Sequence, residues 1–420
     1  MVRMRVLLLN QTFFPDQAAT SQQLLDFARF LRDEGCEVTV MAARRAYGDP
    51  TKTHAAEEVV DGIRVIRVAS TGFGRKSFFH RLIDGLSFEM LLVLRLLFFR
   101  RQDVVIAFTS PPLIGFAALL FCTLHGGKSV QWMMDLNPEI AFAVGYLKEH
   151  SFLGRFFTAL LRVTVRYSDY VVVLDRWMRQ KMLKHGVRSE QIVVVPPWPV
   201  SASPAMDSEL GKLFRERHGI TQKFVVLYSG NHSIAHPLGP ILHTALAMRE
   251  DPDVLFLFIG GGLRESEVKR FREVHALENI RQLPFQPREL LQQSLSAADL
   301  HLVVMGPGMS GLVHVSKIYG VLSMGRPYAF LGPRASHVGD LLEECPFGFL
   351  VEDETQDGLF NVIEAAKKFD AEKLGEIYRA NTAYVADRCS IQHSLATFLS
   401  QVIEPLRKPA VIAVHAPSRA

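Results

Sequence analysis

The feature that most constrains the fold is a repeated alternation of short apolar runs with amphipathic stretches. Arg5–Asn10 is an apolar run, Thr20–Glu34 has the spacing of a helix with one apolar face, and Glu37–Ala42 is a second apolar run. Strand, helix and strand in close succession form a βαβ unit, which requires a parallel sheet. A proline-rich break, Pro196-Pro197-Trp198-Pro199 followed by SASPAMDS, divides the alternation into two blocks. The sequence therefore predicts an α/β protein with two doubly wound, Rossmann-like parallel-sheet domains that face a cleft.

Length and charge agree with two domains and narrow the choice of partners. The chain has 420 residues, of which 48% are hydrophobic and 21% charged, as is typical of a globular protein. Residues 1–197 hold 25 Lys and Arg against 18 Asp and Glu, so this half is basic although the whole chain has a formal net charge of only +4. A basic half suits an anionic membrane surface or substrate. A nucleic-acid partner is not expected, because it requires a denser basic stripe with exposed aromatics.

Cysteine usage and the apolar segments indicate the compartment. The four cysteines are far apart and have no CxxC spacing, which argues against a metal site or a disulfide framework and favours a reducing cytosol. The apolar part of MVRMRVLLLN is too short for a signal peptide and is predicted to be the first buried strand. Four charged residues interrupt the apolar stretch Phe78–Arg101, so a membrane span is not expected.

The stretch Phe78–Arg101 leaves two interpretations open. It is either an internal helix pair of the first domain or, within residues 75–101, a segment that lies in the interface of an anionic bilayer with its basic residues toward the headgroups. The expected location is cytoplasmic, and in the second case peripheral at the inner face of the plasma membrane.

Residues 301–340 hold the strongest candidate for an anion site. His301–Met305 is predicted to be a strand, Gly306-Pro307-Gly308 breaks it, and a helical run follows Ser316 and Lys317. A glycine-bearing loop that leads into such a helix can hold phosphate through open N–H groups, the macrodipole and the lysine charge. The alternative is an ordinary capped helix with an exposed lysine.

Polar residues also follow other predicted strands, at the carboxyl ends where open parallel sheets bind ligands. After the predicted strand Val130–Met134 come Asp135, Asn137 and Glu139. Their carboxylates could bind a substrate hydroxyl or act as a base. Alternatively, Asp135 bonds the backbone and Glu139 is a first-turn helix acid. In the second block, strand exits carry SGNHSIAH and a run of three glycines, which permit close approach of a ligand. The first loop lacks G-x-G-x-x-G, which disfavours a dinucleotide site.

Several of these motifs resemble one known family. Ser316-Lys317-Ile318-Tyr319 with Gly325-Arg326-Pro327, the Asp-x-x-Pro-Glu run at Asp135, the SGNH loop and the opening loop Phe13–Thr20 occur in the order found in retaining glycosyltransferases of family GT4. These enzymes have the GT-B fold and use nucleotide sugars, and the similarity is to the bacterial lipopolysaccharide and exopolysaccharide type. It covers roughly residues 5–400.

The resemblance implies transfer of a sugar from a nucleoside-diphosphate sugar to a lipid-linked or polysaccharide acceptor in cell-surface glycan synthesis, with no metal or other cofactor. It implies catalytic roles for Lys317 and His232 at the leaving diphosphate and for Asp135 at the acceptor. Expected donor-binding residues are Gly230, Asn231, His236, Gly260, Gly261, Phe285, Ser310, Gly311, His314, Ser316 and Tyr319. Expected acceptor-binding residues are Asp16, Thr20, Asn137 and Glu139.

Several of these residues also have a purely structural interpretation. In that interpretation, Thr20 or Ser21 caps a plain turn in the opening loop. The two loop histidines, His232 and His236, are then structural, and Phe285 belongs to the core. The resemblance also sets the expected domains. These are an acceptor-side domain over 1–197, a linker over 198–222, a nucleotide-sugar domain over 223–388, a helix over 389–405 that crosses back to the first domain, and a loose tail over 406–420.

Two departures from the family pattern keep other functions open. Gly320 stands where many members have the second of two paired glutamates, so ribose recognition is unassigned, and Ala18 and Ala19 replace glycines in the opening loop. The alternatives are a nucleotide-sugar epimerase on the same fold and a catalytically silent GT-B partner subunit. The nucleotide base, the sugar, the acceptor and the oligomeric state are not determined by the sequence.

Overall fold

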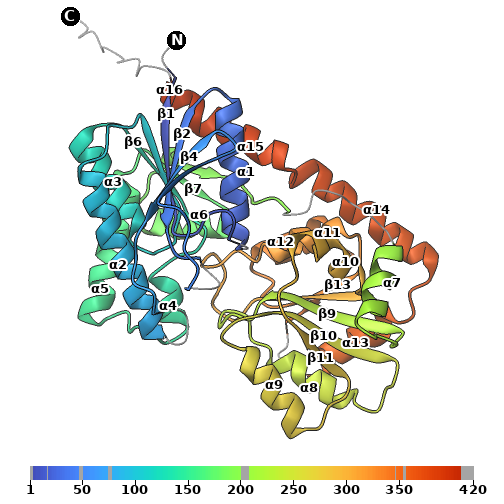
Figure 1. Ribbon diagram of the computed structural model, residues 1–420. Helices are drawn as coiled ribbons and strands as arrows, with labels where there is room; N and C mark the ends of the chain where they lie inside the picture. Colours follow the sequence, from blue (N-terminus) through green and yellow to red (C-terminus); the bar gives the residue numbers. More distant parts are fainter. Residues whose placement is uncertain are drawn as a thin grey trace, which may run out of the picture.

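Two sheets, each with helices on both faces, lie side by side in the computed structural model (Figure 1). The structure describes residues 3–16, 18–46, 51–73, 78–199, 208–345, 347–352 and 356–407. Two doubly wound sheets confirm the predicted fold class.

The first sheet has eight strands in the order β3-β4-β2-β1-β5-β6-β7-β8, and only the β3–β4 pair is antiparallel. Its strands are β1 (Arg5–Leu9), β2 (Glu37–Ala43), β3 (Glu57–Val60), β4 (Ile63–Val68), β5 (Val104–Ala107), β6 (Lys128–Trp132), β7 (Tyr170–Val173) and β8 (Ile192–Val194). Its helices are α1 (Ala19–Asp33), α2 (Phe78–Leu97), α3 (Ile114–His125), α4 (Glu139–Ala143), α5 (Phe152–Tyr167) and α6 (Arg176–Lys184). Strand order reverses between β1 and β5, so the loops after these two strands diverge there.

The second sheet has six parallel strands in the order β11-β10-β9-β12-β13-β14, and its order reverses between β9 and β12. The strands are β9 (Phe224–Asn231), β10 (Val254–Gly261), β11 (Ile280–Leu283), β12 (Leu300–Val304), β13 (Tyr328–Leu331) and β14 (Gly348–Val351). The helices are α7 (Ser208–Arg217), α8 (Gly239–Ala247), α9 (Glu265–Val274), α10 (Leu291–Ser296), α11 (Lys317–Ser323), α12 (His337–Glu344), α13 (Gln356–Ala366) and α14 (Ala371–Arg388).

The end of the described chain returns to the first domain. Helix α15 (Ile391–Phe398), a π-helical turn (Leu399–Ile403) and α16 (Glu404–Arg407) run along one side of the molecule from the second sheet to the first (Figure 1). The ring of Phe398 packs against those of Phe27 and Trp132, with centroids 4.6 and 4.7 Å apart. Buried aromatic contacts of this kind tie the chain end to the first core.

Two local features were not expected from the sequence. Residues 57–68 form a hairpin, because Asp61 and Gly62 both take positive φ and form the tight turn between β3 and β4. The helix pair considered for Phe78–Arg101 is the single helix α2, which continues through Gly85. Among the described residues, no helix is both long and apolar enough to cross a bilayer.

Candidate active site

A cleft of about 1970 Å³ lies between the carboxyl ends of the two sheets. The first domain contributes the loops that follow β1, β5 and β6, and the second contributes the loops after β9, β10 and β11 together with the start of α11. Both topological switch points therefore open onto the same cleft, which is where doubly wound sheets bind ligands.

Lys317, the first residue of α11, is a basic residue of the cleft whose amine is shielded from solvent. Its Nζ is shielded from solvent, has no hydrogen-bond partner and lies 3.9 Å from the ring centroid of Tyr228. A Cβ added to Gly230 would lie 3.5 Å from the same Nζ, so the amine sits over bare backbone. Desolvation lowers the pKa of Lys317 to about 7. A bound anion would raise this pKa again, because an opposite charge favours the protonated amine.

The start of α11 offers fewer open N–H groups than its sequence predicts. The backbone N–H of Val315 donates to His337 Nε2 at 3.1 Å, and that of Ser316 donates to the carbonyl of His314 at 2.9 Å. The N–H groups of Ile318 and Tyr319 donate to the carbonyls of Val315 and Ser316. Ser316 lines the cleft, but its side chain makes no cap hydrogen bond. The lysine side chain, more than the helix end, is therefore what this segment can present to an anion.

Paired glycines form the wall beside Lys317. Gly230 and Gly260 are neighbours in the β9–β10 ladder, with φ of 127° and 136°. A Cβ on Gly260 would lie 2.0 Å from the carbonyl oxygen of Gly230, so only glycine fits there. Asn231 and Gly261 complete this wall of the cleft, and Phe285, 55% exposed, lines it further along.

The two loop histidines differ from the expectation. His232 is only 1% exposed and lies behind the cleft wall, with its ring 5.4 Å from that of Tyr228 and 6.2 Å from that of Phe258. Burial and the nearby Lys317 lower its pKa to about 4. His236 does line the cleft, and burial lowers its pKa to about 3. Both rings are therefore neutral at pH 7, and the predicted direct role of His232 at a diphosphate is not supported by its position.

The predicted acceptor residues of the first domain fall into two groups. Asp135, Asn137, Asp16 and Thr20 line the cleft. The side chain of Asp135 is exposed to the cleft, but the protein that surrounds it raises its pKa to about 6, and the nearby His314 opposes the rise. Glu139 is directed elsewhere, since its Oε1 lies 2.5 Å from His185 Nε2. Its expected acceptor contact is therefore not supported.

The cleft residue His54 was not anticipated. Its Nε2 lies 3.9 Å from Asp16 Oδ1. It belongs to the connection between β2 and β3, where its N–H donates to the carbonyl of Arg44, and no motif in the sequence marked it.

The loop after β12 does not face the cleft over most of its length. Leu312 is 3% exposed and packs within the core of the first domain. Its carbonyl accepts from the N–H of Leu136 at 2.8 Å, and Val313 forms a β-bridge with Asp135. A Cβ on Gly311 would lie 2.7 Å from the carbonyl oxygen of Trp177. The loop thus joins the two domains, which corrects the donor-binding roles expected for Gly311 and its neighbour Ser310.

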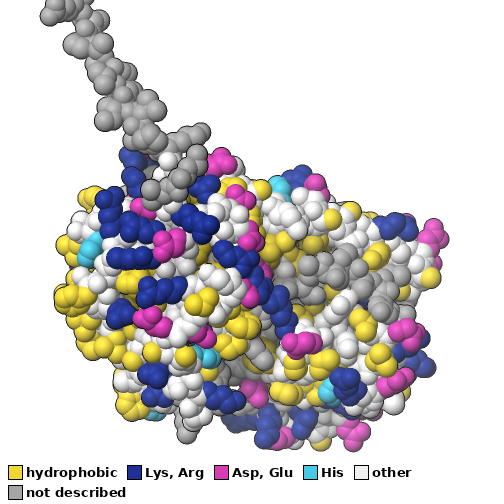
Figure 2. Space-filling view, turned by 45° about the horizontal axis from the view of Figure 1, so that its top comes forward, with side chains coloured by type: hydrophobic (Ala, Val, Ile, Leu, Met, Phe, Trp, Pro, Cys, Tyr) yellow, Lys and Arg dark blue, Asp and Glu magenta, His cyan; other side chains and the backbone are white. Residues whose placement is uncertain are grey.

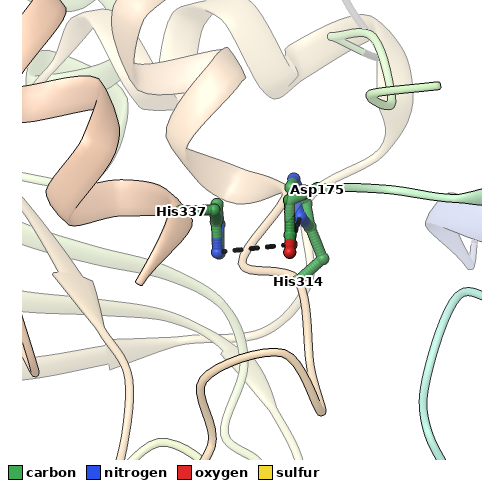
Figure 3. A group of neighbouring side chains, drawn as sticks. All are labelled: Asp175, His314 and His337. Atoms are coloured by element: carbon green, nitrogen blue, oxygen red, sulfur yellow. Dashed lines mark hydrogen bonds and ion pairs between the residues drawn. The ribbon is translucent and has the colours of Figure 1, made fainter. Parts of the chain in front are cut away.

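Asp175, His314 and His337 form a buried cluster behind this loop, with Asp175 contributed by the first domain and both histidines by the second (Figure 3). Asp175 Oδ2 lies 2.7 Å from His314 Nδ1 and 3.9 Å from His337 Nδ1. The histidine rings stack with centroids 3.8 Å apart. His314 Nε2 meets the hydroxyl of Tyr319 at 2.8 Å, so Tyr319 supports His314 and lies behind the cleft wall.

The cluster is better suited to hydrogen bonding than to metal binding. His337 Nε2 accepts the backbone N–H of Val315, so its Nδ1 carries the proton and has no lone pair for a cation. Burial opposes ionisation of Asp175, but the hydrogen bond and charge of His314, with a smaller effect of His337, lower its pKa to about 2. Burial lowers the pKa of His337 well below its usual value. The ionised Asp175 therefore holds His314 at the edge of the cleft.

Two doubly wound domains that oppose their strand ends across a ligand-sized cleft have the GT-B fold. HepE of Anabaena, solved in complex with UDP-glucose, shares this fold with a TM-score of 0.67 at 17% identity, over 96% of this chain and all of HepE. Residues 19–198 match the family model of the glycosyl transferase 4-like domain.

Two curated relatives agree with that match. WcaI of Escherichia coli (strain K12), named as a colanic acid biosynthesis glycosyl transferase, is 25% identical over 267 residues, which cover 60% of this chain and 65% of WcaI. WbjE of Pseudomonas aeruginosa, named as a glycosyltransferase, is 25% identical over 291 residues, which cover 67% of this chain and 70% of WbjE. The match to WcaI thus spans slightly less than two thirds of that protein. The chain therefore has the GT-B fold, and its sequence is similar to those of GT4-type glycosyltransferases.

Proposed function

We propose that the protein is a retaining glycosyltransferase that moves a sugar from a nucleoside-diphosphate sugar to a lipid-linked or polysaccharide acceptor in bacterial cell-surface glycan synthesis. The observation that carries the proposal is the Nζ of Lys317, shielded and unpartnered beside glycine backbone in the cleft. A shielded amine costs free energy unless a counter-charge satisfies it. A diphosphate supplies that charge and accepts strong hydrogen bonds.

In the proposed donor complex the diphosphate lies between Lys317 and the backbone of Gly230 and Gly260. Their positive φ and missing side chains keep this wall open to close approach. Phe285 offers an aromatic face farther along the cleft for the nucleotide base. UDP is the first donor nucleotide to test, because HepE was solved with UDP and with UDP-glucose.

The proposed chemistry breaks the bond between the anomeric carbon and the diphosphate oxygen, and the electron pair stays on that oxygen. Lys317 stabilises the charge that grows there. The acceptor oxygen forms the new bond on the same face of the sugar, and its proton passes to the leaving phosphate. Asp135, with a pKa of about 6, is mainly ionised at pH 7 and accepts a hydrogen bond that orients the acceptor hydroxyl. This route needs no protein nucleophile.

We further propose a cytoplasmic location at the inner face of the plasma membrane. The four cysteines are all free, which suits a reducing compartment. A lipid-linked acceptor would be presented at the membrane surface, and the segment expected to contact anionic lipid, within residues 75–101, includes α2.

Calorimetry with UDP, GDP and their common sugars tests the donor assignment, with Lys317→Ala as the variant. We expect one nucleotide to bind the native chain and to bind Lys317→Ala more weakly. If no nucleoside diphosphate binds, the chain is a silent partner subunit. If the donor alone is converted to its epimer without an acceptor, the epimerase alternative is correct.

A further inference from the structure

Three neighbouring helices of the first domain expose large apolar side chains. Helix α3 packs between α2 and α5, on the same side of the first sheet (Figure 1). We call their solvent side the outer face, together with Phe98, which follows α2 directly. The exposed apolar residues that define it are Met90, Leu94, Phe98, Leu124, Phe152 and Phe156. Phe98 is 90% exposed and Phe152 is 83% exposed. An apolar group of this kind on one side of a domain indicates a contact surface more than scattered apolar residues do.

Packing against the core explains only some of the apolar side chains of α2. Phe88, Leu92 and Leu96 point into the core and are at most 2% exposed. Met90 and Leu94, on other sides of the same helix, are 61% and 49% exposed. A helix that packs on a sheet normally carries polar residues on its solvent side, so the second apolar side is free to serve another contact.

The charged side chains of α3 and α5 are all basic, whereas Arg95 of α2 is paired with Glu57 of β3. Helices α3 and α5 contain no Asp or Glu. The two acids of α2 turn inward: Glu89 is buried and accepts from the N–H of Leu113, and Asp84 accepts from the hydroxyl of Thr71. Arg155 and Arg162 are exposed on α5, and neither has an ion-pair partner among the described residues. Figure 2 shows dark-blue Lys and Arg side chains beside yellow hydrophobic ones over the first domain.

We propose that the outer face docks on the surface of an anionic lipid bilayer. Apolar side chains of a surface helix enter the boundary between headgroups and acyl chains, while arginines reach the lipid phosphates. A second copy of the chain is a poorer occupant, because a two-fold contact would set Arg155 and Arg162 against their own counterparts. The outer face and the cleft are also close in sequence. Val144 and Tyr146 line the cleft, and α5 begins shortly after them at Phe152.

This proposal deepens the proposed function, because it names the surface on which the enzyme would meet a lipid-linked acceptor. Its test does not depend on catalysis. The full chain is sedimented at low salt with vesicles of phosphatidylcholine alone or of phosphatidylcholine with phosphatidylglycerol. We expect binding to the anionic vesicles, weaker binding to the neutral ones and loss of the difference at high salt.

Two double variants remove the two parts of the contact. Phe98→Ser with Phe152→Ser should lower vesicle partitioning by about 100-fold. Arg155→Gln with Arg162→Gln should lower it by roughly 30-fold on anionic vesicles. Matched controls in the second domain are Val274→Ser and the pair Arg217→Gln with Arg270→Gln, all at exposed positions. The controls should bind as the native chain does.

Absence of binding to anionic vesicles at low salt would overturn the proposal, as would equal binding by the double variants and the native chain. A dimer in sedimentation velocity that dissociates in Phe98→Ser with Phe152→Ser would assign the outer face to a second copy instead. Nucleotide binding by calorimetry should be unchanged in these variants, so failure of membrane binding and failure of the donor assignment are separate results.

Discussion

Two loops of the second domain begin at the same topological switch point and yet have opposite uses. Residues 229–237, which form the end of β9 and the loop after it, line the cleft with Gly230 and Asn231 beside Lys317. The loop after β12, residues 305–316, has three glycines against one in residues 229–237 and was the stronger phosphate candidate in the sequence. Its middle packs into the first domain, where Leu312 joins the core.

The difference lies in the apolar residues of the loop after β12. This loop carries Met309, Leu312, Val313 and Val315, each at most 9% exposed. Apolar residues gain free energy by burial, and here Leu312 is buried in the core of the first domain while the other three pack in a cluster of the second. Residues 229–237 are mostly polar and stay at the cleft. The apolar residues of a strand-exit loop thus indicate whether the loop meets protein or ligand.

The largest expected effect is on the cleft side of this comparison. Lys317→Ala should lower sugar transfer by about 100- to 1000-fold, as is typical when one donor to a developing charge is lost. Stability should change little. Steady-state kinetics with the identified donor measures the effect. Lys269→Ala, on the exposed surface of α9, is the matched control and should transfer normally. Near-normal turnover of Lys317→Ala would remove this residue from the mechanism.

On the domain-contact side, Leu312→Ala should lower the free energy of unfolding by about 2–3 kcal/mol. This is the lower end of the range for buried leucines, since the two domains can partly close over the cavity. Chemical denaturation measures the loss, and donor affinity should be nearly unaffected. The control Leu213→Ala, at a side chain 51% exposed, should stay within about 0.5 kcal/mol. If Leu312→Ala lost donor binding but kept its stability, the loop after β12 would be a donor-binding loop and not a contact between the domains.

A smaller effect is expected where the loop after β12 meets the first domain, at Asp175. His314→Ala removes one hydrogen-bond partner from the buried carboxylate of Asp175. The free energy of unfolding should fall by about 1–3 kcal/mol at pH 7. The pKa of Asp175 in the folded protein is lowered to about 2. Its contribution to the free energy of unfolding is therefore complete above about pH 4 and is lost as pH falls from about 4 toward 2.

Unfolding experiments across this pH range test the assignment. The stability difference between the native chain and His314→Ala should shrink as the solution is acidified. A difference that is constant with pH would show that His314 acts by packing and not by pairing with Asp175.

The smallest effect is expected at the rim of the domain contact. Arg176 donates to both carboxylate oxygens of Asp340 at 2.7 and 2.6 Å, but its side chain is 61% exposed. Solvent screens such a pair, so Arg176→Gln should change the free energy of unfolding by less than about 1 kcal/mol. Added salt should reduce even this change. A cost as large as that of Leu312→Ala would mean that charge, not burial, holds the domains together.

By itself the sequence determined the fold class and the edge of each sheet where the site lies. The alternation of β-strand and helix patterns requires parallel sheets, and parallel sheets bring their strand exits together, so Lys317, Asp135, Gly230 and Gly260 could be found without coordinates. The return of the last helix to the first domain was expected only from the family resemblance, and the local pattern did not reveal the turn at Asp61 and Gly62.

Only the tertiary structure decided which of these residues face the cleft. Asp175 and His314 are 139 residues apart and meet because two domains pack, and the same packing turns Ser310 and Gly311 away from the cleft. Burial, which also depends on distant segments, puts His232 behind the wall and lowers the pKa of Lys317 to about 7. Contacts and desolvation that depend on residues far apart in the chain leave no local pattern for the sequence to display.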